Sequence, residues 1–537
     1  MTTTAPRHLP DHSDLPAGAA AGTPDLHTTT YRLIPGTTLD DQVLTTRFGE
    51  LRLKGLTPGA LAALRALAEG DLTEARTSAL VVHGDGETGL LRWQMLRARL
   101  ESAGLFEHAV HRRETAPGEP GIPGVPGAVS GEFAATPGEF EAAPGAPGTA
   151  SGAPGTAHEG SPYGTLLARL TRVGRGGTAL RPTPAGPARL TRHAVVRPAD
   201  GGLVLQAPGS PLAVRFTAGA APFLARLSDW TDAVPAPVLR LLATAGALAP
   251  GGPEQDPEAT SRGSVQWDPV DLAFHTRTRV PASAPGYGGT YRHAERFGPL
   301  PVSVPPGEGE RVPLPVPDLD AVAALDPPLT RVLEERTSVR EHDEDAPLTL
   351  AQLGELLYRT VRIRSTFTGG DGQELADRPV PAGGSLHELD VYPLVSHVDG
   401  LTPGLYRYSG DRHELELVAP AGPLTAPLVK EARGAAMMAA DPQVVLLVAA
   451  RFGRVMWKYE TVAYPLILKH VGVLYQTFYL VGTAMGLAVC GLGGGDTAAF
   501  AAATGHDPLL EGTVGELVLG SRPRTAGAPH APVAAGD

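Results

Sequence analysis

The chain has 537 residues, 42% of them hydrophobic, which is enough for about two to four domains at roughly 150 residues each. Its formal net charge of −12 and the lack of a long basic run argue against nucleic acid or an anionic membrane as the main partner. A single cysteine, Cys490, excludes an internal disulfide and a cysteine-rich zinc site, and it suits the reducing cytoplasm.

Several stretches have the composition of linkers or tails. Residues 1–27 contain no apolar run of the kind found in signal peptides, so we expect a disordered N-terminus. Residues 115–161 are rich in Pro, Gly and Ala and predict a flexible linker. Residues 251–325 are expected to form a second linker with a connecting segment, and residues 523–537 a disordered tail.

The two segments between these stretches, residues 28–114 and 162–250, resemble each other. Each contains a strand–turn–strand pattern and short apolar helices. In each, one helix ends on an Ala-Gly pair, and Gly104 and Gly246 suit the left-handed position that follows a helix. We therefore predict two small winged-helix-like modules. Their hairpin edges could accept an extended peptide as an extra strand, or the modules could simply brace the rest of the protein.

Residues 326–522 have the pattern of a compact domain of helices and strands, and so of an α+β fold. Thr349 and Gln352 form a capping-box pair at the start of one predicted helix. The nearly continuous apolar run "QVVLLVAARF" predicts a central strand. After a long helix and a glycine cluster, we expect a helix from Thr497 and a final strand in "GELVLGS".

The long helix is expected over residues 461–487 and is apolar on nearly every side. Lys469 and His470 interrupt its apolar surface, so we expect it to be buried in protein and not to span a membrane. No membrane partner is therefore predicted.

One short motif in this domain suits an anion. In "RTSVR", Arg336, Ser338 and Arg340 alternate along the chain, which directs their side chains to one side of an extended segment. Two guanidinium groups flanking a hydroxyl can hold a phosphate through charge-assisted hydrogen bonds. The alternative is a solvated charged loop, because Glu and Asp residues lie close by in the sequence.

Two glycine clusters suit close approach of a ligand to the backbone. One is Pro381, Ala382, Gly383, Gly384 and Ser385, which precedes a predicted strand and could equally be a plain turn. The other is "GLGGGD", which includes Gly493 and Gly494. The sequence contains no dinucleotide fingerprint, P-loop or H-E-x-x-H zinc motif, so no metal is predicted.

Taken in order, "RTSVR", "PAGGSLHELDVY", "GLYRY" and "WKYETVAYPLILKHVGVLYQTFYLVGTAMGL" closely resemble the SagB-type (ThcOx-like) dehydrogenases. These are FMN-dependent azoline oxidases of the nitroreductase-like superfamily, and the resemblance covers roughly residues 267–522. It implies a C-terminal nitroreductase-like FMN domain preceded by two winged-helix-like modules that act as a peptide clamp. It also implies a precursor peptide bearing azolines, a cyclodehydratase of the same pathway, and a homodimer with flavin at its interface.

The resemblance also implies roles for individual residues. Arg336, Ser338 and Arg340 match the element that binds the FMN phosphate and ring edge, and Arg522 matches a late basic residue that closes on the phosphate. Residues 381–385 match a loop along the flavin, with Ala382 where serine is common. Gly493 and Gly494 match a loop near the far side of the ring. Lys458 and Tyr459 match the pair assigned to azoline oxidation.

This pair makes chemical sense for such a reaction. A thiazoline or oxazoline becomes aromatic when it loses a proton from Cα and a hydride from Cβ; flavin N5 accepts hydride, and a side chain must accept the proton. An ammonium favours a neighbouring phenolate and partial burial favours a neutral amine, so Lys458 and Tyr459 could activate each other. Pro465 suits a first helical turn, which puts the pair just ahead of the long helix.

Two other functions remain open from the sequence. The first is an NAD(P)H-dependent reductase of nitro compounds or quinones, which would keep the flavin. The second is a non-catalytic scaffold that binds peptide within a modification complex.

Overall fold

The computed structural model describes residues 27–113, 164–249 and 252–523, apart from 41, 47–48, 175–176, 200, 253, 255 and 281–285. The predicted linker 115–161 and nearly all of the predicted tails, 1–27 and 523–537, lie outside the described residues. The chain divides into two compact units, Met1–Arg279 and Val280–Asp537, which are described separately.

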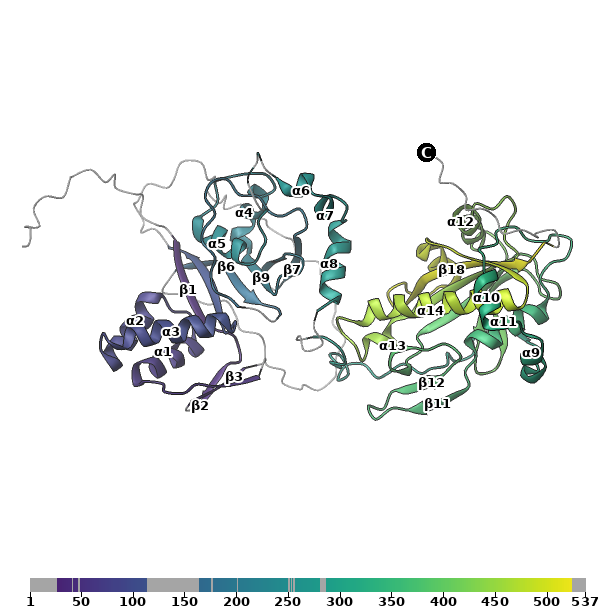
Figure 1. Cartoon of the computed structure of the whole chain (residues 1–537), viewed down its shortest axis with the longest axis horizontal. Coiled ribbons are helices and arrows are strands. Elements are labelled where there is room, and N and C mark those ends of the chain that lie inside the picture. The colour runs from purple at the N-terminus through teal and green to yellow at the C-terminus, as the bar shows by residue number, and fades with distance from the viewer. Residues whose placement is uncertain are drawn as a thin grey trace, which may run out of the picture. The chain divides into compact units, whose positions relative to one another are not determined.

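The first unit is built on one antiparallel sheet of six strands (Figure 1). In spatial order these are β1 (His27–Leu33), β5 (Phe106–Arg112), β6 (Thr165–Arg172), β9 (Leu212–Thr217), β8 (Gly202–Gln206) and β7 (Val195–Ala199). A separate small sheet contains β2 (Thr38–Asp40), β3 (Val43–Thr46) and β4 (Gly49–Arg52).

Short helices pack against both halves of this unit. They are α1 (Pro58–Glu69), α2 (Glu74–Asp85), α3 (Gly89–Ser102), the 3-10 helix η1 (Ala218–Ala220), α4 (Ala221–Arg226) and α5 (Ala236–Thr244). Gly104 and Gly246 follow α3 and α5 with φ values of 70° and 67°, so the predicted left-handed positions are confirmed.

The two repeated segments share one sheet. Strand β5 from the first segment pairs antiparallel with β6 from the second, and Arg169 of β6 forms an ion pair with Asp71 of the first segment. The sequence predicted two modules in tandem but gave no sign that their strands would pair. Their winged-helix-like character stays a prediction.

The segment that we expected to be a linker, residues 251–325, contains regular structure. The first unit includes α6 (Pro257–Thr260), α7 (Arg262–Val265) and α8 (Pro269–Thr278), and the second includes β10 (Arg311–Pro313) and α9 (Leu319–Leu325). Polar and proline-rich composition suggested a linker, but buried Glu258 pairs with Arg189 and holds this segment against the first unit. The linker interpretation was therefore wrong for these helices.

The second unit is built on a seven-stranded sheet in which every pairing is antiparallel. Its strands, in spatial order, are β10, β15 (Glu414–Pro420), β14 (Gly404–Ser409), β13 (Leu389–Val395), β16 (Val444–Arg451), β18 (Glu511–Ser521) and β17 (Leu487–Gly491). A separate hairpin joins β11 (Ser365–Thr368) to β12 (Glu374–Asp377). Because β10 belongs to the large sheet, this unit begins before residue 326, where we had expected its start.

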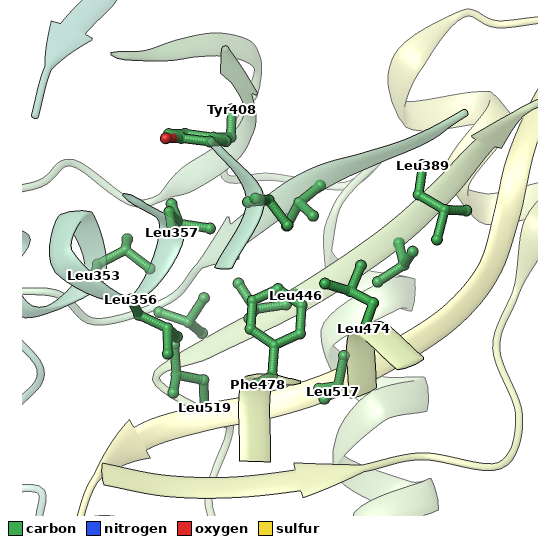
Figure 2. Packing of buried hydrophobic residues seen from close by; sticks show 14 of the residues in the cluster. Leu353, Leu356, Leu357, Leu389, Tyr408, Leu446, Leu474, Phe478, Leu517 and Leu519 are labelled. Atoms are coloured by element: carbon green, nitrogen blue, oxygen red, sulfur yellow. The ribbon is translucent and has the colours of Figure 1, made fainter. Parts of the chain in front are cut away.

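Helices cover both faces of the large sheet. They are α10 (Leu329–Glu335), α11 (Leu350–Val361), α12 (Ala426–Ala436), α13 (Phe452–Met456), α14 (Ala463–Ala484) and α15 (Thr497–Thr504), with the 3-10 helix η2 (Gly383–Ser385). Leu353 and Phe478, from α11 and α14, pack on one face together with Leu446 and Leu517 of the sheet (Figure 2). Helices α12 and α15 cover the other face, where Ala432 and Phe500 contribute to a second core.

Strand β16 lies between β13 and β18, so its predicted central position is confirmed. Leu446 and Val448 enter the core on one face, whereas Leu447 and Ala449 enter the core on the other. Burial of both faces explains why this strand is apolar at consecutive positions. The capping box of Thr349 and Gln352 is also confirmed.

Helix α14 differs from its prediction in two respects. It ends at Ala484, because Gly486 (φ 69°) turns the chain into β17, a strand that the sequence reading missed. It is also buried on one face only: Tyr464 and Leu468 are about 40% exposed, at 40% and 39%, and Gly472 is exposed as well. No helix among the described residues is long and apolar enough to cross a membrane.

Candidate functional site

Lys458 and Tyr459 lie in the short connection between α13 and α14, as the position of Pro465 predicted. Residues 286–297, which we call the strap, run alongside this connection. Gly289 and Tyr459 form an antiparallel bridge, and the amide of Tyr291 donates a 3.2 Å hydrogen bond to the carbonyl of Lys458. The indole Nε1 of Trp457 donates to the carbonyl of Phe297 at 2.7 Å. The strap therefore fixes the backbone of the pair.

The ammonium of Lys458 has a carboxylate partner. Its Nζ donates to Oδ2 of Asp371 at 3.0 Å, and the hydroxyl of Tyr291 donates to the same oxygen at 2.8 Å. Partial burial lowers the pKa of Lys458, but the hydrogen bond and charge of Asp371 outweigh it, so the pKa is raised overall. We had expected burial to favour the neutral amine; burial does act in that direction, but the unexpected carboxylate of Asp371 reverses the net effect.

Tyr459 faces the predicted flavin loop, residues 381–385. Gly384 in this loop has φ 66°, and a Cβ added to it would lie 2.9 Å from the hydroxyl oxygen of Tyr459. Ser385, with φ 55°, closes the turn by donating its amide to the carbonyl of Ala382 at 3.1 Å. The structure thus brings Tyr459 together with residues 381–385, which we call the glycine loop. At position 384, only glycine leaves room for the phenol.

A buried histidine anchors the same loop to α14. The amide of Gly383 donates to Nε2 of His470 at 2.7 Å, and Nδ1 of His470 lies 2.7 Å from Oε1 of Glu388. Glu388 is fully buried. Since Nε2 accepts a hydrogen bond, the ring carries its proton on Nδ1 and donates it to the carboxylate. Leu466, one turn earlier on α14, packs under Gly383, leaving no space for a side chain there.

A buried arginine ties the surrounding segments together. Arg454 of α13 is fully buried, and its guanidinium donates to the carbonyls of Leu300, Glu374 and Leu386. Leu300 lies just after the strap, Glu374 begins β12, and Leu386 directly follows the glycine loop. Burial, together with nearby arginines, lowers the pKa of Arg454 to about 10. The residue remains charged at neutral pH and connects three stretches that are distant in sequence.

The "RTSVR" segment lies near the C-terminal end of α14. The Arg336 guanidinium carbon lies 5.3 Å from the ring centroid of Tyr479, and Oγ of Ser338 lies 2.9 Å from the hydroxyl of the same tyrosine. That hydroxyl also accepts a 2.7 Å hydrogen bond from the amide of Gly491. The predicted common side of Arg336 and Ser338 is therefore the side that meets Tyr479.

Arg340 and Arg522 approach the same edge of the large sheet through their neighbours in sequence. The amide of Val339 donates to the carbonyl of Val489 in β17, and the amide of Asp343 donates to the carbonyl of Ser521 at the end of β18. None of Arg336, Arg340 and Arg522 forms an ion pair with a residue that the structure describes. The segment that holds Arg336 and Arg340 thus lies along β17 and the end of β18, which Arg522 follows directly in the chain.

Gly493 and Gly494 lie between β17 and α15 and are exposed. A Cβ added to either would meet no atom within 4 Å, so this loop can approach a ligand closely. Neighbouring Gly495 packs directly against the carboxyl of Glu516. Burial raises the pKa of Glu516 to about 7, and the charge of Glu431 adds to this effect.

The predicted residues therefore form two groups along α14. Lys458, Tyr459 and the glycine loop lie at its N-terminal end, and Arg336 and Ser338 meet Tyr479 towards its C-terminal end. At 1.5 Å per residue, about 20 Å of helix separates Leu466 from Tyr479. Among the residues that the structure describes, no group of three or more His, Cys, Asp or Glu side chains could hold a metal ion.

Several residues of this site were missed by the sequence reading: Tyr291, Asp371, Glu388, Arg454 and Tyr479. His470 had been noted only as an interruption of an apolar helix. Each makes its contact with residues far away in sequence, and no local pattern points to such a partner.

Comparison with known proteins identifies the second unit. The Nitroreductase family model matches residues 333–521. The putative nitroreductase MJ1384 of Methanocaldococcus jannaschii is 28% identical over 188 residues, which are 34% of this chain and 85% of that protein.

Two solved structures are also similar. A putative nitroreductase from Ralstonia eutropha JMP134 is 24% identical, covers 42% of this chain and 95% of its own, and gives a TM-score of 0.31. The microcin synthetase McbBCD complex of E. coli, with truncated pro-MccB17 bound, is 20% identical and covers 48% of this chain and 96% of that chain, with a TM-score of 0.31. From the match to the family model, residues 333–521 form a nitroreductase-family domain within a protein of mixed helices and sheets.

Proposed function

We propose that the protein is an FMN-dependent dehydrogenase that oxidises thiazolines or oxazolines to thiazoles or oxazoles in a ribosomally made peptide. The observation that carries this proposal is the position of Tyr459: its hydroxyl faces Gly384 in the loop that the family resemblance assigns to the flavin. Lys458, the other member of the pair, is held next to it by Asp371 and the strap.

The residues present fit FMN. Arg336, Arg340 and Arg522 offer three guanidinium groups, none of them in an ion pair with a described residue, to a phosphate dianion. Ser338 and Tyr479 add hydroxyl groups at the same edge. At the other end of α14 lies the loop of residues 381–385, which the family resemblance assigns to the ring and which packs against Leu466 and Tyr459 through Gly383 and Gly384.

Bound FMN would supply the acceptor for the hydride that leaves Cβ of the azoline, with dioxygen as the final oxidant. The chain's own residues would bind the substrate and remove the Cα proton. Lys458 and Tyr459 are the side chains we assign to this proton transfer, which requires a group within hydrogen-bond reach of Cα. The glycine loop orients the ring, and the buried His470–Glu388 pair holds the loop in place.

The proposal is tested with purified protein and a synthetic azoline peptide. The protein should be yellow, and mass spectrometry should show a loss of 2 Da (about two hydrogens) per ring oxidised. Lys458→Ala and Tyr459→Phe should each abolish azole formation while FMN stays bound. If both variants oxidise the peptide at the normal rate, the assignment is wrong.

A second candidate is an NAD(P)H-dependent reductase of nitro compounds or quinones. It is favoured by the family match and by the relative from M. jannaschii, a putative nitroreductase. Rapid bleaching of the flavin by NADPH, followed by reoxidation with a quinone, would support this candidate. The absence of bleaching, together with bleaching by an azoline peptide, would exclude it in favour of the dehydrogenase.

We also propose a homodimer. The two groups of site residues lie at opposite ends of α14, and Tyr464, Leu468 and Gly472 leave one face of this helix uncovered in a single chain. A second copy could cover that face and bring the arginines of one chain towards the glycine loop of the other. Sedimentation equilibrium of the FMN-loaded protein measures the mass directly, and a monomer at micromolar concentration would contradict the proposal.

The substrate peptide is expected to contact the first unit. Strand β4 is an edge strand of its small sheet, and all four of its residues are exposed. An edge strand of this kind can pair with an extended peptide. A cyclodehydratase of the same pathway would supply the azolines.

A further inference from the structure

The carboxylate of Asp371 accepts hydrogen bonds from three different residues. It lies in the turn between β11 and β12, where Oδ1 accepts the amide of Gln373 at 3.1 Å. That bond leaves Oδ2 for Lys458 and Tyr291, which donate to it at 3.0 and 2.8 Å. The hairpin turn, the strap and the connection before α14 therefore meet at a single carboxylate oxygen.

The ion pair between Lys458 and Asp371 is largely shielded from solvent, and it keeps both groups charged. The side chains of Lys458 and Asp371 are only 20% and 18% exposed. The hydrogen bond from Lys458 lowers the pKa of Asp371 to about 2, while the pKa of Lys458 is raised. Both groups are therefore ionised throughout the neutral range. An ammonium has three donors and no acceptor, so it cannot take a proton from a substrate.

Tyr291 is not available for the proton either. Its hydroxyl donates to Asp371, and this hydrogen bond raises its pKa. Tyr459 is different, because its hydroxyl faces Gly384 and not the carboxylate. Nζ of Lys458 lies 5.9 Å from the centroid of the Tyr459 ring, so the cation stands beside the phenol while its hydrogen bond goes to Asp371.

We propose that Asp371 is a positioning residue that holds Lys458 as a hydrogen-bonding cation, so that Tyr459 alone accepts the substrate proton. This inference rests on the proposed azoline dehydrogenase function. The Cα–H bond breaks, its electron pair becomes the new Cα=Cβ bond, and the proton moves to the side-chain oxygen of Tyr459. A bound FMN would supply the acceptor for the hydride from Cβ, and dioxygen would take up the two electrons.

Substitution of Lys458 by Arg or by Met distinguishes two roles for this residue: a permanent cation or a base that accepts the proton. Arginine stays protonated at every accessible pH, so it can replace a cation but not a base. We expect Lys458→Arg to keep kcat within about tenfold of the wild type, and Lys458→Met to lower it by about 10²-fold or more. Tyr459→Phe should lower kcat by about 10²- to 10⁴-fold. If Lys458→Arg is as inactive as Lys458→Met, the cation role is wrong.

A second measurement needs no activity. The pH dependence of acetic anhydride labelling at Lys458, followed by mass spectrometry, reports the fraction of neutral amine. In the FMN-loaded protein, Asp371→Asn should make Lys458 react at lower pH, and Asp371→Glu should restore part of the wild-type profile. Asp377→Asn is the matched control: it lies on the same hairpin, is 51% exposed and pairs only with Arg364. An unchanged profile in Asp371→Asn would overturn the inference.

The two measurements also separate this inference from the proposed function. If the wild-type protein makes no azole, the proposed function is wrong and the role of Tyr459 falls with it. The labelling profile would still decide for or against Asp371 as the residue that keeps Lys458 charged. If azole is formed but Asp371→Asn changes neither kcat nor labelling, the function stands and the inference about Asp371 is wrong.

Discussion

The backbone amide of Gly383 donates a 2.7 Å hydrogen bond to Nε2 of His470, which lies on the buried face of α14. The opposite nitrogen of the ring is tied to Glu388, a carboxylate with no exposed surface. A rigid helix thereby fixes the backbone of the proposed flavin loop. The side chain that does this comes from the helix that directly follows the connection with Lys458 and Tyr459.

Substitution of His470 should weaken cofactor binding. In His470→Ala the partly buried amide of Gly383 loses its acceptor and fully buried Glu388 loses its partner, which costs about 1–3 kcal/mol. We expect the dissociation constant for FMN to rise by roughly 5- to 150-fold, because the loop is no longer held in its binding conformation. Quenching of flavin fluorescence measures the constant. Lys469→Ala, on the exposed side of the same helix, is the control and should change it little.

The three arginines should recognise the phosphate and not the ring. Arg336→Ala, Arg340→Ala and Arg522→Ala should each weaken FMN binding by about tenfold to a hundredfold, the worth of a charged hydrogen bond. Riboflavin, which lacks the phosphate, should bind equally to wild type and variants. Arg331→Ala is a suitable control, since Arg331 is exposed and already paired with Glu335. Equal losses for FMN and riboflavin would contradict a phosphate site.

Arg454 should matter for stability. Arg454→Met removes the guanidinium that donates to three backbone carbonyls, those of Leu300, Glu374 and Leu386; of these residues, Leu386 is fully buried. We expect the free energy of unfolding to fall by about 3 kcal/mol or more. Urea denaturation followed by circular dichroism gives this value. Arg433→Met, at an exposed ion pair with Asp441, should cost less than about 1 kcal/mol.

Glu516 should make the stability of the second unit depend on pH. Its pKa is raised by burial from 4.5 to about 7 in the folded protein, so folding favours the protonated carboxyl. The resulting stabilisation is fully present below pH 4.5 or so and is lost as pH rises through about 7. Urea midpoints measured between pH 5 and pH 8 should fall more steeply for the wild type than for Glu516→Gln. Parallel curves would show that Glu516 does not titrate in this range.

Local patterns predicted the elements of the second unit well. The apolar run of β16 indicated a strand with two buried faces, the Thr349–Gln352 pair indicated a helix start, and alternation in "RTSVR" indicated a common side for Arg336 and Ser338. In these cases the signal lies within a few residues of the feature. The periodicity of a helix or a strand decides which neighbouring side chains share a face, so such local features can be predicted from the sequence.

The protonation of Lys458 could not be predicted in this way. Its partner, Asp371, is separated from it by 87 positions and lies in a Gly-rich turn that carries no sign of a role. From the sequence, burial was the only visible influence, and it pointed in the wrong direction. The same reason explains why Glu388 was missed, since it becomes important only when the fold brings it to His470.

The pairing of β5 with β6 has a consequence for dissecting the N-terminal half of the protein. Each repeat closes its sheet with a strand from the other, so a fragment ending after Arg113 or starting at Gly164 would expose an unsatisfied strand edge and part of a core. Such fragments should aggregate when expressed alone, yet reassociate when produced together. We therefore expect that residues 28–114 and 162–250 fold only together, and that a domain swap between proteins must move both segments.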